Sequence, residues 1–401
     1  MSNYNNVQFI SWELNTGPFI AGNAQFPVGW YCGVRDPGPD QRLGTFGQRI
    51  DIETRLAFVA DAIARAHALC DPSAATLKVF MAPEFLFRGA GGAYLHDLID
   101  GWQGQAPGEL GLPAPYDKPW PGLFGGLRAL AADARFEDWL FVFGTAVSAS
   151  FPTRGRDGKQ VLDPTRPGEI YNTALIQRGG PAHGADTYVS RKHYISGIDF
   201  LRWYGNPGQH SAGSVLPLDP DALVPAEAMG TNEGGALFQI AGVSDGAGTP
   251  IDFGIEICLD HACSGGNYAN AFGRIRSAGK LVKIQLVPSG GMSLRPDSVR
   301  LQAAKGSVAG AYAFNCDGLG NLDGGSGSHT QVWGSCAAGA PPRLQRLFEA
   351  SSGAAVPGSQ VAAVAQTVMV SIGQVPAISL WNNGQGVAGA GHVRVLAPLG
   401  L

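Results

Sequence analysis

The sequence predicts a single α/β domain. Strand-like and helix-like segments alternate over most of its 401 residues, and 45% of the residues are hydrophobic, which is enough to fill a large core. Neither an internal repeat nor a clean linker interrupts this alternation. One domain spanning residues 1–401 is therefore the simplest organisation.

In the first half of the chain, apolar residues that recur every three or four positions indicate helices, and short continuous apolar runs indicate buried strands. In order, we expect a strand at residues 7–14, a loop at 17–47, a helix along Ile52, Leu56, Val59, Ile63, Ala66 and Leu69, a strand at 77–81, a helix along Leu123, Leu127 and Leu130, and a strand at 139–145.

In the second half, turn residues separate the elements. Gly179-Gly180 is a hairpin signal, and Pro296-Asp297 suits the first turn of a helix. In order, we expect strands at 171–177 and 187–193, strands at 236–241 and 251–258 joined across a turn, a helix with Tyr268, Phe272 and Ile275, a strand at 281–287, a helix from 296, and strands at 311–315, 330–333 and 361–370.

Three stretches lack periodicity and interrupt the alternation. They are insertions at about 89–121, 151–168 and 205–235, and a further segment at about 335–401 extends the C-terminal side. The first is rich in Gly and Pro and too long for an ordinary connection, so we expect it to act as a lid or to shape a substrate site.

Charge and composition exclude several classes of partner. The net charge is −4 and no run of five basic residues occurs, so we expect no nucleic-acid partner. No apolar run reaches about 18 residues, so we expect no membrane partner. The polar start shows no targeting signal, and six scattered cysteines without a C-x-x-C pair favour free thiols. We therefore expect a cytoplasmic protein.

The run Phe253, Ile255, Ile257 alternates like a buried strand and ends at Cys258. A Gly-rich turn follows, so the sulfur can face a cleft with backbone N–H groups nearby. A cysteine in such a run is also typical of ordinary core packing. Cys258 therefore needs partners before it can be interpreted as a nucleophile.

Two other strand ends carry an isolated charge. Glu84 lies between apolar runs, where its pKa would rise and it could accept a proton, although it could instead cap a turn or pair with Arg88. Lys192 follows a strand-like run; it could lower the pKa of a thiol and meet an oxyanion, or simply be solvated.

Together the three segments resemble motifs of the nitrilase superfamily of carbon–nitrogen hydrolases, which carry Glu, Lys and Cys in this chain order. Met81-Ala82-Pro83-Glu84-Phe85 resembles the glutamate motif, residues 188–194 resemble the lysine motif, and residues 254–261 resemble the cysteine motif. Weaker similarities occur at 171–174, 286–289 and 311–318, so the resemblance covers roughly residues 7–333.

The resemblance implies an α-β-β-α sandwich with large loop insertions, in a homodimer or higher homo-oligomer, and no cofactor. Glu84 would be the base, Lys192 the cation and Cys258 the nucleophile that attacks a small amide or nitrile. The N–H of Leu259 would meet the oxyanion. A second carboxylate would hold the lysine, with Asp199 nearest in sequence and Glu227 and Glu233 as alternatives.

The chain also departs from the family pattern. Leu259 stands where the family prefers an aromatic residue, and the insertions are large, so the substrate class stays open. The same site could transfer an acyl group to an amine, or the chain could be a catalytically silent binding protein. His261 would be a structural hydrogen-bonding residue or a substrate contact rather than a general base.

Three other motifs favour ordinary structural roles. The G-x-S-x-G pattern at residues 242–246 lacks a following helix and indicates a hairpin turn. Cys258, His261 and Cys263 lie within six residues without a fourth ligand, so we expect no metal site. The Gly-rich stretch 324–329 lacks the Lys-Ser/Thr ending of a phosphate-binding loop.

Overall fold

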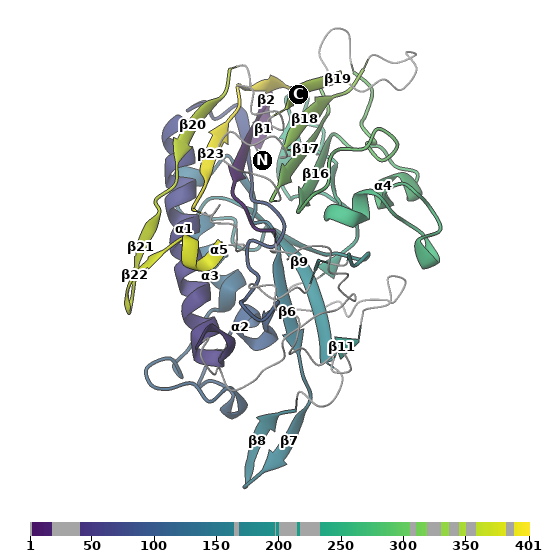
Figure 1. Ribbon diagram of the computed structural model, residues 1–401. Coiled ribbons are helices and arrows are strands. Elements are labelled where there is room, and N and C mark those ends of the chain that lie inside the picture. Colours follow the sequence, from purple (N-terminus) through teal and green to yellow (C-terminus); the bar gives the residue numbers. More distant parts are fainter. Residues whose placement is uncertain are drawn as a thin grey trace.

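The computed structural model describes residues 2–17, 41–163, 168–196, 198–199, 215–216, 233–304, 310–318, 330–336, 345–349, 358–381 and 389–401. Over these residues the protein is mixed α/β, with two large sheets and few helices (Figure 1). The α/β expectation is therefore confirmed at this level.

The larger sheet is built around parallel strands from the first half of the chain. Its main path is β12 (Glu233–Gly234), β10 (Thr187–Arg191), β9 (Gly168–Arg178), β5 (Trp139–Val142), β3 (Thr76–Met81), β2 (Asn6–Glu13), β23 (His392–Val395) and β20 (Gln360–Ala363), with β4 (Tyr94–Leu95), β6 (Ala146–Ser150), β11 (Val215–Leu216) and β24 (Leu399–Gly400) off this path. Strands β2, β3 and β5 run parallel, whereas β9 is antiparallel to β5 and β23 is antiparallel to β2.

The smaller sheet contains the strand that precedes Cys258. Its order is β13 (Leu237–Phe238), β15 (Phe253–Ile255), β16 (Ile284–Ser289), β17 (Tyr312–Asp317), β18 (Gln331–Gly334) and β19 (Gln345–Glu349). Three separate pairs are β1 (Ser2–Tyr4) with β14 (Val243–Asp245), β7 (Thr153–Arg156) with β8 (Lys159–Leu162), and β21 (Thr367–Val370) with β22 (Gly373–Pro376).

The two large sheets pack face to face. One hydrophobic cluster takes alternate residues from both sheets, such as Val7 and Phe9 of β2 and Tyr312 and Phe314 of β17. The Phe9 ring lies 5.9 Å from the Tyr312 ring and 4.9 Å from the Phe314 ring, centroid to centroid. Because side chains alternate along a strand, the other residues of β2 face away from this cluster.

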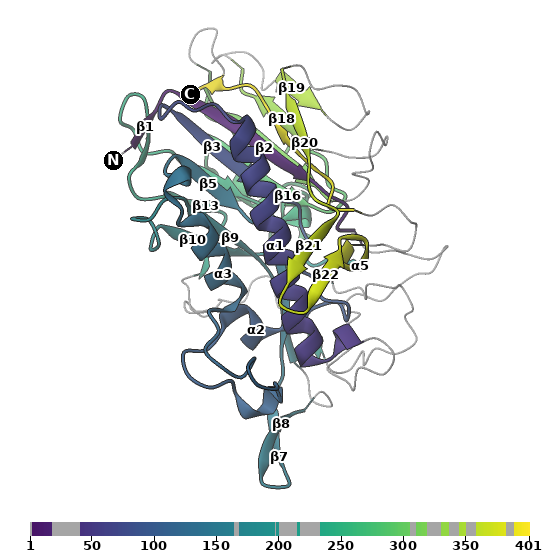
Figure 2. The same ribbon diagram turned by 90° about the vertical axis from the view of Figure 1, so that its left-hand side faces the viewer.

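Helices cover the outer faces of the sheets. The described helices are α1 (Thr45–Leu69), α2 (His96–Asp100), α3 (Gly122–Ala131), α4 (Arg274–Ser277) and α5 (Ile378–Trp381), with 3₁₀ turns η1 (Gln41–Leu43), η2 (Gly108–Leu110), η3 (Ala134–Phe136), η6 (Cys258–His261) and η7 (Gly266–Tyr268). Ile10 and Trp12 of β2 pack with Phe58 of α1 in a second hydrophobic cluster, and Figure 2 shows α1 lying across β2 and β3. On the far side of the smaller sheet, Ile275 of α4 belongs to a third cluster.

Several expected elements in the first part of the chain differ in the structure. Helix α1 starts at Thr45, so residues 45–47 are helical rather than loop. The strand expected at 139–145 ends at Val142, because Gly144 adopts a φ of +63° and the chain restarts as β6. The insertion expected as loop at 151–168 contains the β7–β8 hairpin.

The predictions of a helix around 268–275 and of another from 296 are wrong. Only η7 and the short α4 form in the first region, where Tyr268 has a φ of +59°. In the second, residues 296–298 form a single turn, in which the N–H groups of Ser298 and Val299 donate to the Arg295 carbonyl. No helix continues from it, because the Arg300 N–H donates to the Gln285 side chain and the Gln302 N–H to the Val282 carbonyl.

The late strand expected at 361–370 is also two elements. Strand β20 pairs with β23 in the larger sheet, whereas β21 pairs with β22 in a separate hairpin. The segment expected as a C-terminal extension thus adds β20 and β23 to the sheet beside β2. Of the insertion expected at 205–235, residues 205–214 and 217–232 lie outside the described residues, as do 324–329.

Packing between the two sheets gives a test of the fold. Phe9→Ala should lower the free energy of unfolding by about 3–5 kcal/mol, because it leaves a cavity between the sheets. Met369→Ala is the control, since Met369 is 68% exposed and its loss should cost less than about 0.5 kcal/mol. Urea denaturation of both variants measures the difference; equal costs would contradict this packing.

Candidate active site

Glu84 lies just after the end of β3 and is completely buried. Its backbone N–H donates to the Ser289 carbonyl at 3.2 Å, and its own carbonyl accepts from the Thr16 hydroxyl. The next N–H, of Phe85, donates to the Thr145 hydroxyl at 2.9 Å. These bonds tie the Glu84 backbone to the ends of strands from both large sheets.

Lys192 follows β10 and meets two carboxylates. Its Nζ lies 2.9 Å from Glu84 Oε1 and 2.7 Å from Asp199 Oδ1, and all three side chains are fully buried. Asn172 Nδ2, on the neighbouring strand β9, donates to Glu84 Oε1 at 2.9 Å and to Asp199 Oδ2 at 3.3 Å. The alternative of a solvated Lys192 is therefore wrong.

The hydrogen bonds of Arg88 go to backbone carbonyls and not to Glu84, so the alternative that the two residues pair is not supported. Arg88 donates to the backbone carbonyls of Ile198 and Thr16, at 3.2 and 2.9 Å. Both bonds lie next to the site, because Ile198 precedes Asp199 and the Thr16 hydroxyl donates to the Glu84 carbonyl. Arg88 thus fastens the segments that carry the two carboxylates.

Cys258 begins the short turn η6, whereas the strand expected to run to Cys258 ends earlier, at Ile255 of β15. Its φ is +47°, a left-handed conformation that costs a non-glycine residue about 1–3 kcal/mol. It is 5% exposed, and its sulfur lies near Glu84, Lys192 and the Gly290 N–H. The turn therefore points the sulfur toward the buried carboxylates and ammonium instead of continuing the strand.

Gly290 makes this approach sterically feasible. A Cβ atom at this position would lie 2.9 Å from the Phe85 ring and 3.3 Å from Glu84 Oε2. Such distances are too short for most side chains, so a glycine lets the backbone pass close to the site. Among the described residues, no N–H or O–H group donates to Glu84 Oε2, and the Cys258 thiol lies next to the Glu84 carboxyl, so this buried oxygen is available for the thiol proton.

The charges in this site shift each other's protonation. Burial, assisted by Asp199 and opposed by Lys192, raises the pKa of Glu84 to about 7. Burial and the Glu84 carboxylate raise the pKa of the Cys258 thiol well above its usual value, against Lys192. Burial opposes the charge of Lys192, but the carboxylates of Asp199 and Glu84 raise its pKa well above the usual value. At neutral pH the site therefore contains a charged lysine and a neutral thiol.

The remaining sequence candidates fall into different positions. Asp199 contacts Lys192, whereas Glu227 lies outside the described residues, and Glu233 is in β12 without a described side chain. Leu259 is half-buried in η6, and its N–H has no acceptor within this first turn. His261 is fully buried and bonds to Glu256 Oε2 at 2.6 Å and the Arg295 N–H at 3.0 Å, which favours the structural role.

Sequence reasoning missed two residues that organise the site. Asn172 bridges both carboxylates, and it lies in the segment 171–174 that carried only a weak similarity. Asp260 accepts the N–H groups of His193 and Tyr194 at 3.0 and 2.8 Å, so it joins the segment after Lys192 to the turn of Cys258. The acidic residue two positions after the cysteine was the available signal.

Two of the other sequence motifs lie among the described residues. No group of three His, Cys, Asp or Glu side chains there could hold a metal ion, and no described helix is both long and apolar enough to cross a membrane. The pattern at 242–246 belongs to β14 and a turn in which the Gly248 N–H donates to the Asp245 carbonyl. Five of the six cysteines are free thiols; Cys32 lies outside the described residues.

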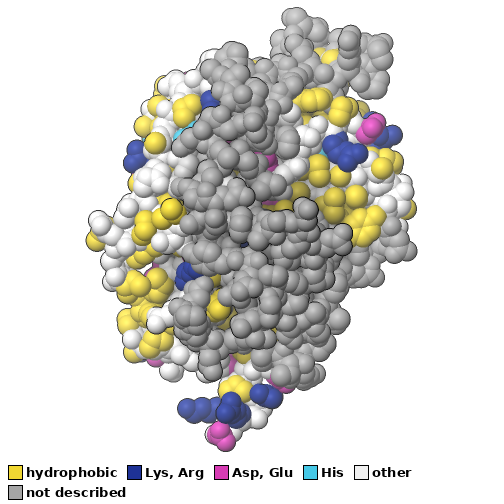
Figure 3. All heavy atoms as spheres, viewed as in Figure 1, with side chains coloured by type: hydrophobic (Ala, Val, Ile, Leu, Met, Phe, Trp, Pro, Cys, Tyr) yellow, Lys and Arg dark blue, Asp and Glu magenta, His cyan; other side chains and the backbone are white. Residues whose placement is uncertain are grey.

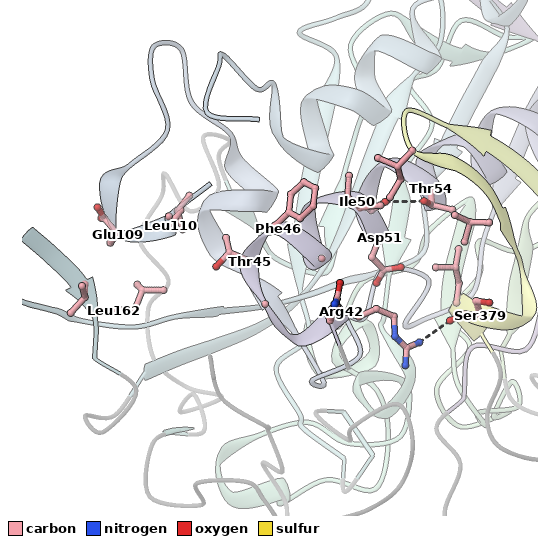
Figure 4. Close-up of a pocket in the computed structure, with 18 of the residues that line it drawn as sticks. Arg42, Thr45, Phe46, Ile50, Asp51, Thr54, Glu109, Leu110, Leu162 and Ser379 are labelled. Atoms are coloured by element: carbon pink, nitrogen blue, oxygen red, sulfur yellow. Dashed lines mark hydrogen bonds between the residues drawn. The ribbon is translucent and has the colours of Figure 1, made fainter. Parts of the chain in front are cut away.

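A cavity of about 750 Å³ surrounds the N-terminus of α1, and its lining includes neither Glu84, Lys192 nor Cys258 (Figure 4). Glu109 and Leu110 from the insertion at 89–121 line it, together with Leu162 of β8 and Ser379 of α5. Figure 3 shows the β7–β8 hairpin projecting with Lys and Arg side chains on its surface. These insertions therefore shape a cavity that the Glu84 site does not share.

No protein-family model matches the chain, and no curated protein matches it. Solved structures similar to it include a crystal structure of N-terminal amidase, with 11% identity, a TM-score of 0.30, and coverage of 72% of this chain and 48% of that one. A crystal structure of N-terminal amidase with an Asn-Glu-Ala peptide is also similar, with 10% identity, a TM-score of 0.29, and coverage of 72% of this chain and 49% of that one. This chain spans about half the length of these amidase chains.

Burial of Glu84 predicts a pH-dependent stability difference. A carboxyl whose folded pKa exceeds its unfolded value favours folding at low pH, and this contribution is lost as pH rises through the folded pKa. The shift from 4.5 to about 7 corresponds to about 3 kcal/mol at most. Glu84→Gln should therefore gain up to this amount relative to the wild type between pH 4.5 and 8, measured by urea denaturation. A constant difference would contradict the shift.

Proposed function

We propose that this protein is a cofactor-free thiol hydrolase of the nitrilase type that cleaves a non-peptide C–N bond in a small amide or nitrile. The observation that carries the proposal is the buried contact between Glu84 and Lys192, 108 positions apart in sequence, beside the sulfur of Cys258. A base, a cation and a nucleophile in one buried site are the groups that covalent acyl transfer requires.

The first step forms the covalent intermediate. Glu84 accepts the proton of the Cys258 thiol, and the sulfur attacks the carbonyl carbon of an amide. The negative charge on the oxygen is met by Lys192 and by the Leu259 N–H, and each such donor contributes roughly 3 kcal/mol in other hydrolases. The proton on Glu84 then goes to the leaving nitrogen as the C–N bond breaks. A nitrile would instead give a thioimidate.

The second step releases the product. Glu84, now ionised, accepts a proton from a water molecule that attacks the thioester carbon. The C–S bond breaks, the acid leaves, and the proton on Glu84 returns to the sulfur. Glu84 therefore carries one proton through each half-reaction, which suits a carboxyl whose pKa is raised to about 7.

Asp199 would be the second carboxylate that the resemblance implies. Its Oδ1 contacts Lys192 Nζ at 2.7 Å and also accepts the Ser196 N–H at 3.1 Å. Asp199 therefore fixes the direction of the ammonium while leaving Glu84 Oε2 for the proton. In this role Asp199 positions the lysine and does not contact the substrate.

The finer organisation belongs to the same proposal. The packing of α1, the two sheets and α4 supports an α-β-β-α sandwich of the nitrilase type. Within it we place one domain with its insertions, acting in the cytoplasm as a homodimer or larger homo-oligomer. Because the three catalytic side chains are at most 5% exposed, transfer of the acyl group to an amine is a second candidate reaction.

Replacing the nucleophile tests the proposal directly. Cys258→Ala should lower kcat/KM by at least about 10⁴-fold, since it removes the sulfur that forms the covalent bond. Ammonia release from a panel of small amides, nitriles and carbamoyl compounds is the measurement, with and without an added amine to detect acyl transfer. The control is Cys316→Ala, which removes another buried thiol of the same core cluster and should keep the activity. Full activity of the Cys258→Ala variant would rule out the mechanism.

The pH profile tests the base. Since Glu84 must be ionised to accept the thiol proton, kcat/KM should fall about tenfold per pH unit below about pH 7. Asp199→Asn removes a negative charge that raises this pKa, so the acidic limb should move to lower pH. A profile that is flat between pH 5 and 8 would remove Glu84 from this role.

A further inference from the structure

A second buried pair of side chains, Glu256 and His261, flanks the nucleophile Cys258 in the sequence. Glu256 lies two positions before Cys258 and His261 three positions after it, and Oε2 of the one meets Nδ1 of the other at 2.6 Å. Both side chains are completely buried. The bond therefore joins the strand that leads into the Cys258 turn to the end of that turn.

The partners of this pair are all hydrogen-bond donors. The Glu256 carboxylate accepts the Ile275 N–H at 2.7 Å through Oε1, and the Gln285 amide at 2.8 Å through Oε2. His261 Nε2 accepts the Arg295 N–H at 3.0 Å, so this network assigns the ring proton to Nδ1, which donates to Glu256. Both ring nitrogens of His261 are therefore engaged in hydrogen bonds.

The pair lies on the side of the smaller sheet away from the reacting groups. Ile255 and Ile257 face the other sheet, so Glu256 faces α4, where it accepts the Ile275 N–H. Arg295 belongs to the segment that continues from Gly290, whose N–H lies beside the Cys258 sulfur. The Glu256–His261 pair therefore holds both the turn η6, which carries the Cys258 sulfur, and the segment from Gly290 to Arg295, which carries the Gly290 N–H.

We infer that Glu256 and His261 are positioning residues that hold Cys258 in its left-handed conformation for attack. The inference rests on the proposed function and adds to it. The φ of +47° at Cys258 persists only if the surrounding structure fixes it, and the bond between residues 256 and 261 closes around that position. Neither residue contacts the substrate.

Glu256→Gln is the most informative variant, because it keeps the size and replaces one acceptor oxygen and the negative charge by a neutral NH₂ donor. Whichever way the amide turns, its NH₂ faces a donor, either the Ile275 N–H or the His261 and Gln285 donors. We expect a fall in kcat of about 100-fold, the effect of a misplacement of about 1 Å, with KM changed less than about threefold. His261→Asn keeps a donor for Glu256 but loses the Arg295 bond, so its loss should be intermediate.

The matched control is His392→Asn. His392 Nε2 meets Glu13 Oε2 at the same distance of 2.6 Å, between β23 and β2 of the larger sheet. This variant should lower the melting temperature but keep kcat. If Glu256→Gln and His261→Asn lower only the melting temperature, as the control does, the pair is merely structural and the inference is wrong. If Glu256→Gln does not fold, His261→Asn decides the question by the same two measurements.

Alkylation of the thiol separates this inference from the proposed function. The rate at which iodoacetamide modifies Cys258, followed by mass spectrometry, needs no substrate and should fall about tenfold in Glu256→Gln but not in His392→Asn. If the wild type hydrolyses no amide or nitrile, the proposed function fails while this comparison still tests the pair. If the wild type is active, and Glu256→Gln keeps both the kcat and the alkylation rate of the wild type, the positioning inference alone fails.

Discussion

The structure of the site depends on the burial of one ammonium between two carboxylates. Removing such charges from water costs several kcal/mol each, and close pairing with further hydrogen bonds must offset that cost. Lys192 meets Glu84 and Asp199 within 3 Å, and Asn172 supplies a further donor to both carboxylates. Because these side chains are almost completely buried, the segments that carry them must keep their relative positions for the charges to stay paired.

Arg88 brings the number of buried charges near the site to four, two of each sign. It is 1% exposed, and burial lowers its pKa to about 9. Ionising Cys258 would add an uncompensated negative charge to this set, which explains why burial and Glu84 raise the pKa of the thiol. A proton that stays within the site, on Glu84 or on the sulfur, keeps the charge balanced.

The sequence predicted the parts of this site that depend on strand ends. Apolar runs before Glu84 and Cys258 correctly located both residues at the carboxyl ends of strands, and β3 and β15 end within a few positions of them. It could not predict Asn172 and Asp260, because a side chain that bonds across strands leaves no periodic pattern. The helix expected from 296 failed for a similar reason, since the distant Gln285 side chain and Val282 carbonyl accept the N–H groups of Arg300 and Gln302.

Strand β2 pairs with β3 on one side and with β23 on the other, and the Glu13 carboxylate meets His392 across 379 positions. During synthesis on the ribosome, β3 follows β2 closely, whereas the partner of Glu13 in β23 emerges 379 positions later. One edge of β2 therefore remains unpaired while this long stretch is made, and such edges are where chains associate wrongly. The larger sheet consequently cannot be completed as soon as its central strands have emerged.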